Sequence, residues 1–225
     1  MVKSWSDTVD YTANMIFGVP GGQDGPSGVI VCCEDRIYYR HDKSTPLCIP
    51  IPRRRGPTED PNRKRIIVSG CLHLSKARHE FFFLLQTEDG DVFKLNMEMG
   101  EDAQGRKTSQ PERMTMKYYE TFPVAKQMLL IRKGYIYIAA ENGNSKLYHV
   151  NDLAEDPDVE PENNFSSDDV SADPAEDYTP TYFQPRGLTF TSLAHDVPSQ
   201  HPLMRAKVDN LTLSLIHISE PTRPY

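Results

Sequence analysis

The chain has 225 residues, 38% of them hydrophobic, which is enough for one large domain or two small ones with an apolar core. Its longest uninterrupted apolar run is the six residues Tyr135–Ala140, far short of a membrane-spanning helix. The 18 prolines and 13 glycines favour many turns, and four cysteines without a Cys-x-x-Cys motif are typical of thiols in a reducing compartment.

Short runs rich in β-branched and aromatic residues predict an all-β fold with little helix. Between them, a Gly-rich loop at 20–28 lacks the motifs of phosphate-binding loops and is interpreted as a structural turn. Residues 53–65 form a loop with two basic clusters, and the polar stretch Gly100–Gln110 is expected to be a mobile loop. The predicted strands lie at about 13–17, 29–33, 66–74, 80–87, 91–97, 113–119, 127–132, 134–140 and 145–150.

Three times, an apolar run ends in an acidic turn and a second apolar run returns. The glutamates of these turns, Glu34, Glu88 and Glu141, are 54 and 53 residues apart. Asp89-Gly90 and Asn142-Gly143 are strong hairpin signals because such turns are expected to need positive φ at both residues. A hairpin that recurs every 50 residues or so predicts a partial β-propeller of about three four-stranded antiparallel blades, forming an incomplete ring.

Several predicted strands are apolar on both faces, as expected for blades with neighbours on both sides. The clearest case is Phe81-Phe82-Phe83, because adjacent side chains of a strand point to opposite faces. We therefore expect residues 1–150 to be propeller blades, and residues 181–212 to begin one or more further blade strands.

The charge of the chain is unevenly distributed. Residues 151–180 hold 11 acidic residues and no Lys or Arg, so the formal net charge of −7 becomes +4 without them. This composition predicts a disordered acidic loop. Within it, Ser166 and Ser167 precede two aspartates and are candidate phosphorylation sites, the alternative being an unmodified polar spacer. Residues 213–225 are similar to a translated sequencing adapter and are expected to be an artefact.

Few residues of the sequence are candidates for binding, metal coordination or catalysis. Arg53, Arg54 and Arg55 are candidates for contact with RNA or an acidic partner, and the alternative is a loop clamped by Glu59-Asp60. Cys71 and His73 share a strand face, and Cys48 and His79 could approach, but metal-ligand spacing is lacking, so we expect no metal and no cofactor. No nucleophile motif or fixed carboxylate pair is present, and we expect no enzymatic activity.

Several long motifs, in order over about residues 5–190, resemble the family of splicing factor 3b subunit 3, especially its fungal forms. They are Ala13-Asn14-Met15, Val19–Gly22, Asp24–Val29, Ile51–Arg55, Phe81–Asp91, Lys117–Tyr119, Pro123–Ala125, Ala139–Asn144 and Tyr182–Arg186.

The resemblance implies a piece of the first of three propellers in a much longer protein. Relatives with that layout include the large damaged-DNA-binding subunit and the largest subunit of the cleavage and polyadenylation specificity factor. It further implies a nuclear, non-catalytic scaffold of the U2 small nuclear ribonucleoprotein that supports branch-site recognition. Its implied partners are the helical-repeat subunit and a small subunit of splicing factor 3b, with no membrane or small-molecule substrate and at most indirect contact with RNA.

Three alternatives stay open from the sequence. The same architecture could serve as an adaptor in ubiquitin ligation or in mRNA 3′-end processing, or it could bind RNA directly through Arg53–Arg55.

An open arc of blades leaves apolar faces without neighbours, so we expect the lone chain to aggregate or stay partly unfolded. The short length would also fit if Met1 were an internal methionine of a longer protein.

Overall fold

The protein is nearly all β in the computed structural model. The structure describes residues 5–42, 44–57, 59–60, 62–75, 79–101, 107–131, 134–153, 163–169, 179–199, 203 and 205–207. Helical structure among these residues is limited to 3-10 turns, at Asn163 and at Ser167–Asp169. A search of the same residues finds no helix of the length and hydrophobicity that crossing a membrane requires.

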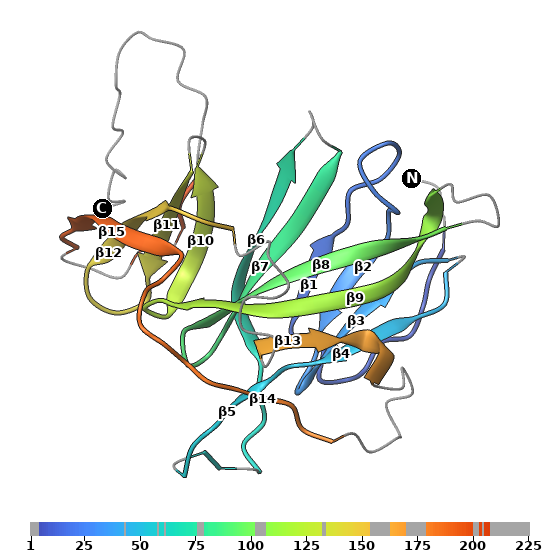
Figure 1. The fold of residues 1–225 in the computed structure, drawn as a ribbon, viewed down its shortest axis with the longest axis horizontal. Coiled ribbons are helices and arrows are strands. Elements are labelled where there is room, and N and C mark those ends of the chain that lie inside the picture. Colours follow the sequence, from blue (N-terminus) through green and yellow to red (C-terminus); the bar gives the residue numbers. More distant parts are fainter. Residues whose placement is uncertain are drawn as a thin grey trace, which may run out of the picture.

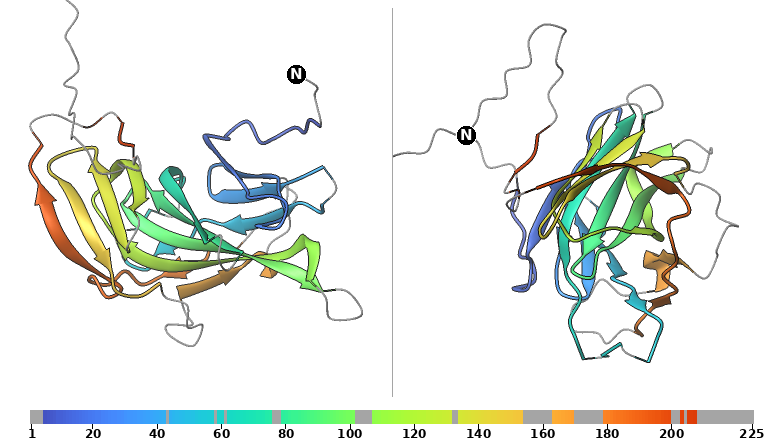
Figure 2. Two further views of the ribbon diagram at one scale, coloured as in Figure 1. Left: turned by 90° about the horizontal axis from the view of Figure 1, so that it is seen from above. Right: turned by 90° about the vertical axis from the view of Figure 1, so that its left-hand side faces the viewer.

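Three antiparallel sheets follow one another along the chain and stack in the same order (Figures 1 and 2). Blade 1 contains β1 (Met15–Gly18), β2 (Val29–Cys32), β3 (Arg36–Arg40) and β4 (Leu47–Pro50). Blade 2 contains β6 (Ile67–Ser75), β7 (Glu80–Thr87), β8 (Asp91–Glu101) and β9 (Lys107–Thr121). Blade 3 contains β10 (Ala125–Ile131), β11 (Tyr135–Ala140), β12 (Ser145–Val150) and β15 (Thr191–Val197). The described residues form no closed ring, so the predicted partial β-propeller of three blades is confirmed.

The repeated acidic turns occupy equivalent positions in the three blades. Each joins the second strand of its sheet to the third, as β2–β3, β7–β8 and β11–β12. Positive φ occurs at one residue of each turn, at Asp35 (62°), Gly90 (88°) and Gly143 (80°). The expectation of two positive φ values per turn was wrong. In the β7–β8 turn, the Gly90 N–H donates to the Thr87 C=O at 3.0 Å, so the turn closes around Glu88 and Asp89 rather than around Asp89 and Gly90.

Two apolar layers hold the blades together. Blades 1 and 2 enclose one cluster, to which Phe83 contributes with 0% exposure, and blades 2 and 3 enclose another, to which Phe82 contributes with 6%. The prediction that neighbouring rings point to opposite, dry faces is therefore confirmed. Each buried ring stabilises the fold by about 1.5–3 kcal/mol.

The chain makes an excursion between the third and fourth strands of blade 3. After β12 it runs past blades 1 and 2, and there β14 (Tyr182–Phe183) pairs in parallel with β5 (Arg53–Arg54). It then returns as β15, which pairs with β12. Strand β15 therefore completes blade 3 rather than beginning a further blade. The sequence signal was weak, because β15 is a largely exposed edge strand without alternating apolar residues.

Part of the acidic segment is ordered, contrary to the prediction. Strand β13 (Asn164–Ser166) adds a fifth strand to blade 2 by pairing with β9, and Phe165 packs into the core between blades 1 and 2. One buried ring and an available strand edge offset the chain entropy that the acidic composition alone would not. Residues 154–162 and 170–178 of the predicted loop, and the adapter-like residues 213–225, lie outside the described residues.

The polar stretch 100–110 also differs from the expectation. Strand β8 continues to Glu101 and β9 begins at Lys107, with Met99 opposite Pro111. Cross-strand pairing extends the hairpin through polar residues that carry no apolar alternation. Residues 102–106 lie outside the part that the structure describes.

Candidate functional site: an arginine cluster between two blades

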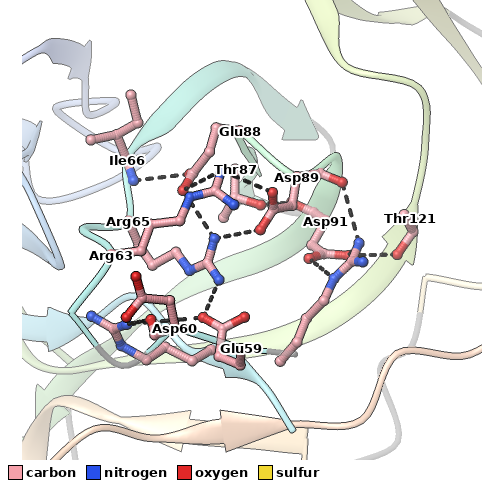
Figure 3. Close-up of polar contacts among 12 residues, drawn as sticks. Glu59, Asp60, Arg63, Arg65, Ile66, Thr87, Glu88, Asp89, Asp91 and Thr121 are labelled. Atoms are coloured by element: carbon pink, nitrogen blue, oxygen red, sulfur yellow. Dashed lines mark hydrogen bonds and ion pairs between the residues drawn. The ribbon is translucent and has the colours of Figure 1, made fainter. Parts of the chain in front are cut away.

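The basic loop at 53–65 lies against the acidic turns of blades 1 and 2. Its arginines meet carboxylates of the β7–β8 turn and of the loop itself (Figure 3). A further carboxylate comes from Asp35 in the β2–β3 turn. We call this set the arginine cluster. It consists of Arg53, Arg54, Arg63 and Arg65 with Asp35, Glu59, Glu88, Asp89 and Asp91.

Arg53 and Asp35 form the buried part of the cluster. The Arg53 Nη2 donates to Asp35 Oδ1 at 3.0 Å, and both side chains are 5% exposed. The same carboxylate oxygen accepts the Arg65 backbone N–H at 2.9 Å, and the Arg53 Nη1 donates to the Asp60 C=O at 3.2 Å. The Arg53 Nε is buried without a hydrogen-bond partner, but the ion pair and the other hydrogen bonds reduce the penalty of an isolated buried charge.

Arg54 binds Asp91 through two parallel hydrogen bonds. Its Nε donates at 2.8 Å and its Nη2 at 2.7 Å to the two carboxylate oxygens. Asp91 also accepts a hydrogen bond from the Thr121 hydroxyl at 2.7 Å, which fixes the carboxylate. The hydrogen bond with Asp91, more than any other interaction, raises the pKa of Arg54. This two-point geometry fixes the loop on blade 2.

Arg65 joins the loop to the β7–β8 turn. Its side chain is 4% exposed, and it contacts Glu59, Glu88 (3.1 Å) and Asp89. The Glu88 carboxylate also accepts the Ile66 N–H at 3.1 Å. Burial alone would lower the pKa of Arg65, but the hydrogen bonds to Glu59 and Glu88 together with the nearby charges raise it. The guanidinium therefore stays charged inside the cluster.

The charges of this region balance. It has six basic side chains, Arg53, Arg54, Arg55, Arg63, Lys64 and Arg65, and six acidic ones, Asp35, Glu59, Asp60, Glu88, Asp89 and Asp91, so its formal charge is 6 − 6 = 0. A neutral cluster produces little long-range attraction for a polyanion. The arrangement suits a clamp that holds blades 1 and 2 together.

The structure separates the three arginines singled out by the sequence. Arg53 and Arg54 bind carboxylates of the protein, as the clamped-loop alternative expects, whereas Arg55 is exposed. Contact of this triplet with RNA or a partner stays a prediction, and the geometry favours Arg55 over its neighbours. The sequence did not indicate that acidic residues 18 to 37 positions away would meet the loop.

The two candidate phosphorylation sites lie beside β9. The Ser167 Oγ is buried and accepts the Met114 N–H at 2.9 Å, whereas the half-buried Ser166 accepts the Asp168 N–H at 3.2 Å. A kinase could reach Ser167 only after this segment leaves blade 2. Phosphorylation of either serine stays a prediction.

The cysteines and histidines that could have formed a metal site, Cys48, Cys71, His73 and His79, do not come together. Cys48 lies in a cluster on one side of blade 1, whereas Cys71 packs between blades 2 and 3. His73 stacks on Phe82 at 4.8 Å, and the Nδ1 of His79 lies 3.0 Å from Asp24. Burial raises the pKa of Cys48 to about 11 and that of Cys71 to about 12. The described residues contain no group of three His, Cys, Asp or Glu side chains placed to hold a metal.

The sequence did not predict a second set of buried polar contacts, between β9 and the segment just before β15. Glu120 is fully buried, and its Oε1 accepts the N–H groups of Thr189 (2.8 Å), Phe190 (2.5 Å) and Thr191 (3.1 Å). Beside it, the Arg186 guanidinium lies over the rings of Tyr118 and Phe190. The Tyr182–Arg186 motif was the available signal, since clustered aromatics next to Arg favour such stacking.

Stacked four-stranded antiparallel sheets define this chain as part of a β-propeller. The chain belongs to the family of the RSE1/DDB1/CPSF1 first beta-propeller, whose family model matches residues 1–178.

Curated relatives agree with this assignment. The chain is 48% identical over 212 residues to pre-mRNA-splicing factor rse1 of Emericella nidulans, covering 94% of this chain and 17% of that protein. It is 46% identical over 213 residues to the Neurospora crassa protein of that name, covering 94% and 17%. Splicing factor 3B subunit 3 of Danio rerio is 38% identical over 212 residues, covering 94% and 16%. The chain therefore spans about one-sixth of the length of the curated relatives it matches.

Proposed function

We propose that this chain is a non-catalytic scaffold segment of a nuclear pre-mRNA splicing factor. The observation that carries the proposal is the 48% identity to a splicing factor over 94% of the chain. Function is argued from this likeness because a propeller fold alone serves many unrelated activities. The stacked blades supply rigid edges and loops, and the arginine cluster fixes the first two blades to each other.

The finer form of the proposal places the segment in the U2 small nuclear ribonucleoprotein. There it supports branch-site recognition by docking the helical-repeat subunit and a small subunit of splicing factor 3b. The motifs from Ile51–Arg55 to Tyr182–Arg186 support this form, because they resemble the splicing branch of the family. In the structure both motifs contribute to one strand pair, β5 with β14.

Co-purification from nuclear extract tests the proposal. The longer natural protein that carries this segment should recover branch-site splicing proteins and U2 RNA. Recovery of a cullin or of polyadenylation factors in their place would favour the adaptor alternatives, which the shared family model keeps open. Failure to recover any splicing component would contradict the proposal.

Direct RNA binding through the basic loop is the second candidate. The exposed Arg55 supplies a surface test, because Arg53→Ala, Arg54→Ala and Lys64→Ala would also break ion pairs with Asp35 or Asp91. If Arg55→Ala abolishes ultraviolet crosslinking to RNA and leaves partner recovery unchanged, this candidate gains. Unchanged crosslinking would remove it.

A further inference from the structure

Residues 163–169 cross the outer edges of blades 1 and 2. Strand β13 pairs with β9 at the edge of blade 2, and the 3-10 turn Ser167–Asp169 that follows it lies against β4 of blade 1 (Figure 1). We call residues 163–169 the edge strap. Blades 1 and 3 have four strands each, so the edge strap is an addition to blade 2 rather than part of the common blade.

A short ladder and one buried ring hold the edge strap in place. The three residues of β13 pair with β9, and the Phe165 ring, 9% exposed, packs into the core between blades 1 and 2. At the end of the strap, the Arg113 Nη1 donates to Asp168 Oδ2 at 3.2 Å, and both of these side chains are exposed. A segment held in this way opens locally at a lower free energy than the sheet that carries it.

The Ser167 hydroxyl continues the ladder where β13 turns into the 3-10 turn. Its Oγ accepts the Met114 N–H at 2.9 Å, and Ser167 and Met114 are 7% and 0% exposed. A phosphate on this oxygen would bring a charge of about −1.5 to −2 into a site closed to water. The esterified oxygen would also leave the Met114 N–H without its acceptor. A phosphorylated Ser167 is therefore incompatible with a seated strap.

The neighbouring Ser166 is placed differently. It is half-buried, and its Oγ accepts the Asp168 N–H at 3.2 Å. Its partner in the ladder is Thr115, two residues from Arg113 along β9, so Ser166 and Arg113 lie on the same face of the sheet. A phosphate on Ser166 would reach solvent beside the Arg113 guanidinium, and the strap would stay seated.

We propose that Ser167 is a phosphorylation site and that its phosphate releases the edge strap from blades 1 and 2. The following Asp168 and Asp169 suit a kinase that selects acidic sequences, and the kinase acts on the strap while it is locally open. The γ-phosphoryl group passes from ATP to the Ser167 Oγ, ADP leaves, and the hydroxyl proton passes to the catalytic base of the kinase. The new charge then prevents the strap from returning. This regulation acts on the junction of two blades, whichever complex the scaffold serves.

Native-state hydrogen exchange of the longer natural protein that carries this segment tests the switch. Phosphoserine introduced during translation in place of Ser167 should speed exchange of the Met114 amide and of the amides of 164–166 by about tenfold or more. Phosphoserine in place of Ser166 is the matched control, and it should leave these rates within about twofold of the wild type. Aspartate would not serve as a substitute, since its carboxylate could itself accept the Met114 N–H. Unchanged exchange with phosphoserine at position 167, or equal effects at both positions, would overturn the proposal.

The amides of β7 separate release of the strap from unfolding of blade 2, because release leaves their exchange unchanged. If they also exchange faster, wild-type protein phosphorylated after folding by an acidophilic kinase decides the matter. Faster exchange at Met114 with β7 still protected supports the proposal, and exposure of β7 again contradicts it.

Mass spectrometry of phosphopeptides tests whether the site is used. Protein from growing cells treated with phosphatase inhibitors should carry phosphate on Ser167. Its absence from Ser167 in a peptide that is recovered and sequenced would contradict the assignment of the site.

Discussion

Arg53 and Arg55 are two residues apart, and the structure places them in opposite environments. Arg53 pairs with Asp35 in the protein interior, whereas Arg55 lies at the surface. Removing one member of a buried ion pair leaves the other charge uncompensated. The same residue type is therefore buried in an ion pair at one position and exposed at the surface at the other.

Arg53→Ala should lower local stability at the junction of blades 1 and 2 by about 1–3 kcal/mol, because Asp35 would lose its buried guanidinium partner and keep only Lys64 and the Arg65 N–H. Arg55→Ala, the matched control, should change it by about 0.5 kcal/mol or less. Native-state hydrogen exchange of β3 and β7 amides measures both. Equal effects of the two substitutions would contradict the clamp.

His73 gives a pH dependence of known sign. Burial, and then the nearby Lys94 charge, lower the pKa of His73 below its ordinary value of 6.5. The unfolded chain therefore takes up this proton at a higher pH than the folded chain. The stability contributed by neutral His73 is present above pH 6.5 and is lost as pH falls below it.

Urea denaturation midpoints measured from pH 8 to pH 5, a range of about three units that spans the ordinary titration of histidine, test this sign. His73→Phe should keep the ring stack on Phe82 and flatten the part of the acid-side decline that His73 causes. A variant whose pH dependence matches that of the wild type would show that His73 is not its cause.

At the scale of the element, the acidic turns set the register of the blades. Gly90 and Gly143 both have positive φ, at 88° and 80°. A Cβ at Gly90 would lie 2.3 Å from the Phe122 carbonyl oxygen, whereas a Cβ at Gly143 would meet nothing within 4 Å. The two glycines share a backbone requirement and differ in the space around them.

Gly143→Ala should destabilise its hairpin by about 1 kcal/mol through backbone strain alone. Gly90→Ala should destabilise by about 3 kcal/mol or more, because strain and a clash with backbone combine. Hydrogen exchange of the β7–β8 and β11–β12 hairpins compares them. Similar losses at both sites would mean that the contact with Phe122 relaxes freely.

One buried ring anchors β14 within the chain segment between β12 and β15. Phe183 is 1% exposed and packs 5.1 Å from Phe93 and 4.7 Å from Tyr118, whereas its neighbour Tyr182 is 40% exposed. Phe183→Ala should weaken the docking of β14 by about 3–5 kcal/mol. Tyr182→Ala should cost about 1 kcal/mol at most. Limited proteolysis at residues 179–186 distinguishes the two, and equal cleavage would contradict this assignment.

Sequence patterns found the elements whose signals are local. Alternating apolar residues and Gly-containing turns located the hairpins of β7–β8 and β11–β12 to within a few residues. They missed β13 and β15, because each is a polar edge strand whose partner lies 50 or so residues earlier in the chain. Strand pairing of that kind is decided by a distant edge rather than by the segment itself.

The candidate site was found only in part, for a similar reason. The Arg53–Arg55 triplet and the nearby Glu59-Asp60 were visible in the sequence, and the structure confirms contacts between Arg53 and both acidic residues. The turn acids Asp35 and Asp91 could not be assigned, because their proximity arises from the stacking of two sheets.

On the scale of the whole molecule, the blades form an arc with unequal ends. At one end, residues 5–13 contact blade 1 through Asp7, Thr12 and Ala13. At the other end, Tyr135, Tyr137 and Leu147 are only partly buried on blade 3, and no further sheet of the described chain packs beside them. A docking scaffold of this kind depends on neighbours that the arc itself does not supply.

Light scattering during size-exclusion chromatography, combined with thermal melting of the lone chain, tests the open arc most directly. The account predicts species larger than a monomer, or a broad transition without a single cooperative step, because the apolar face of blade 3 has no neighbour. A monodisperse monomer that melts in one sharp transition would contradict it.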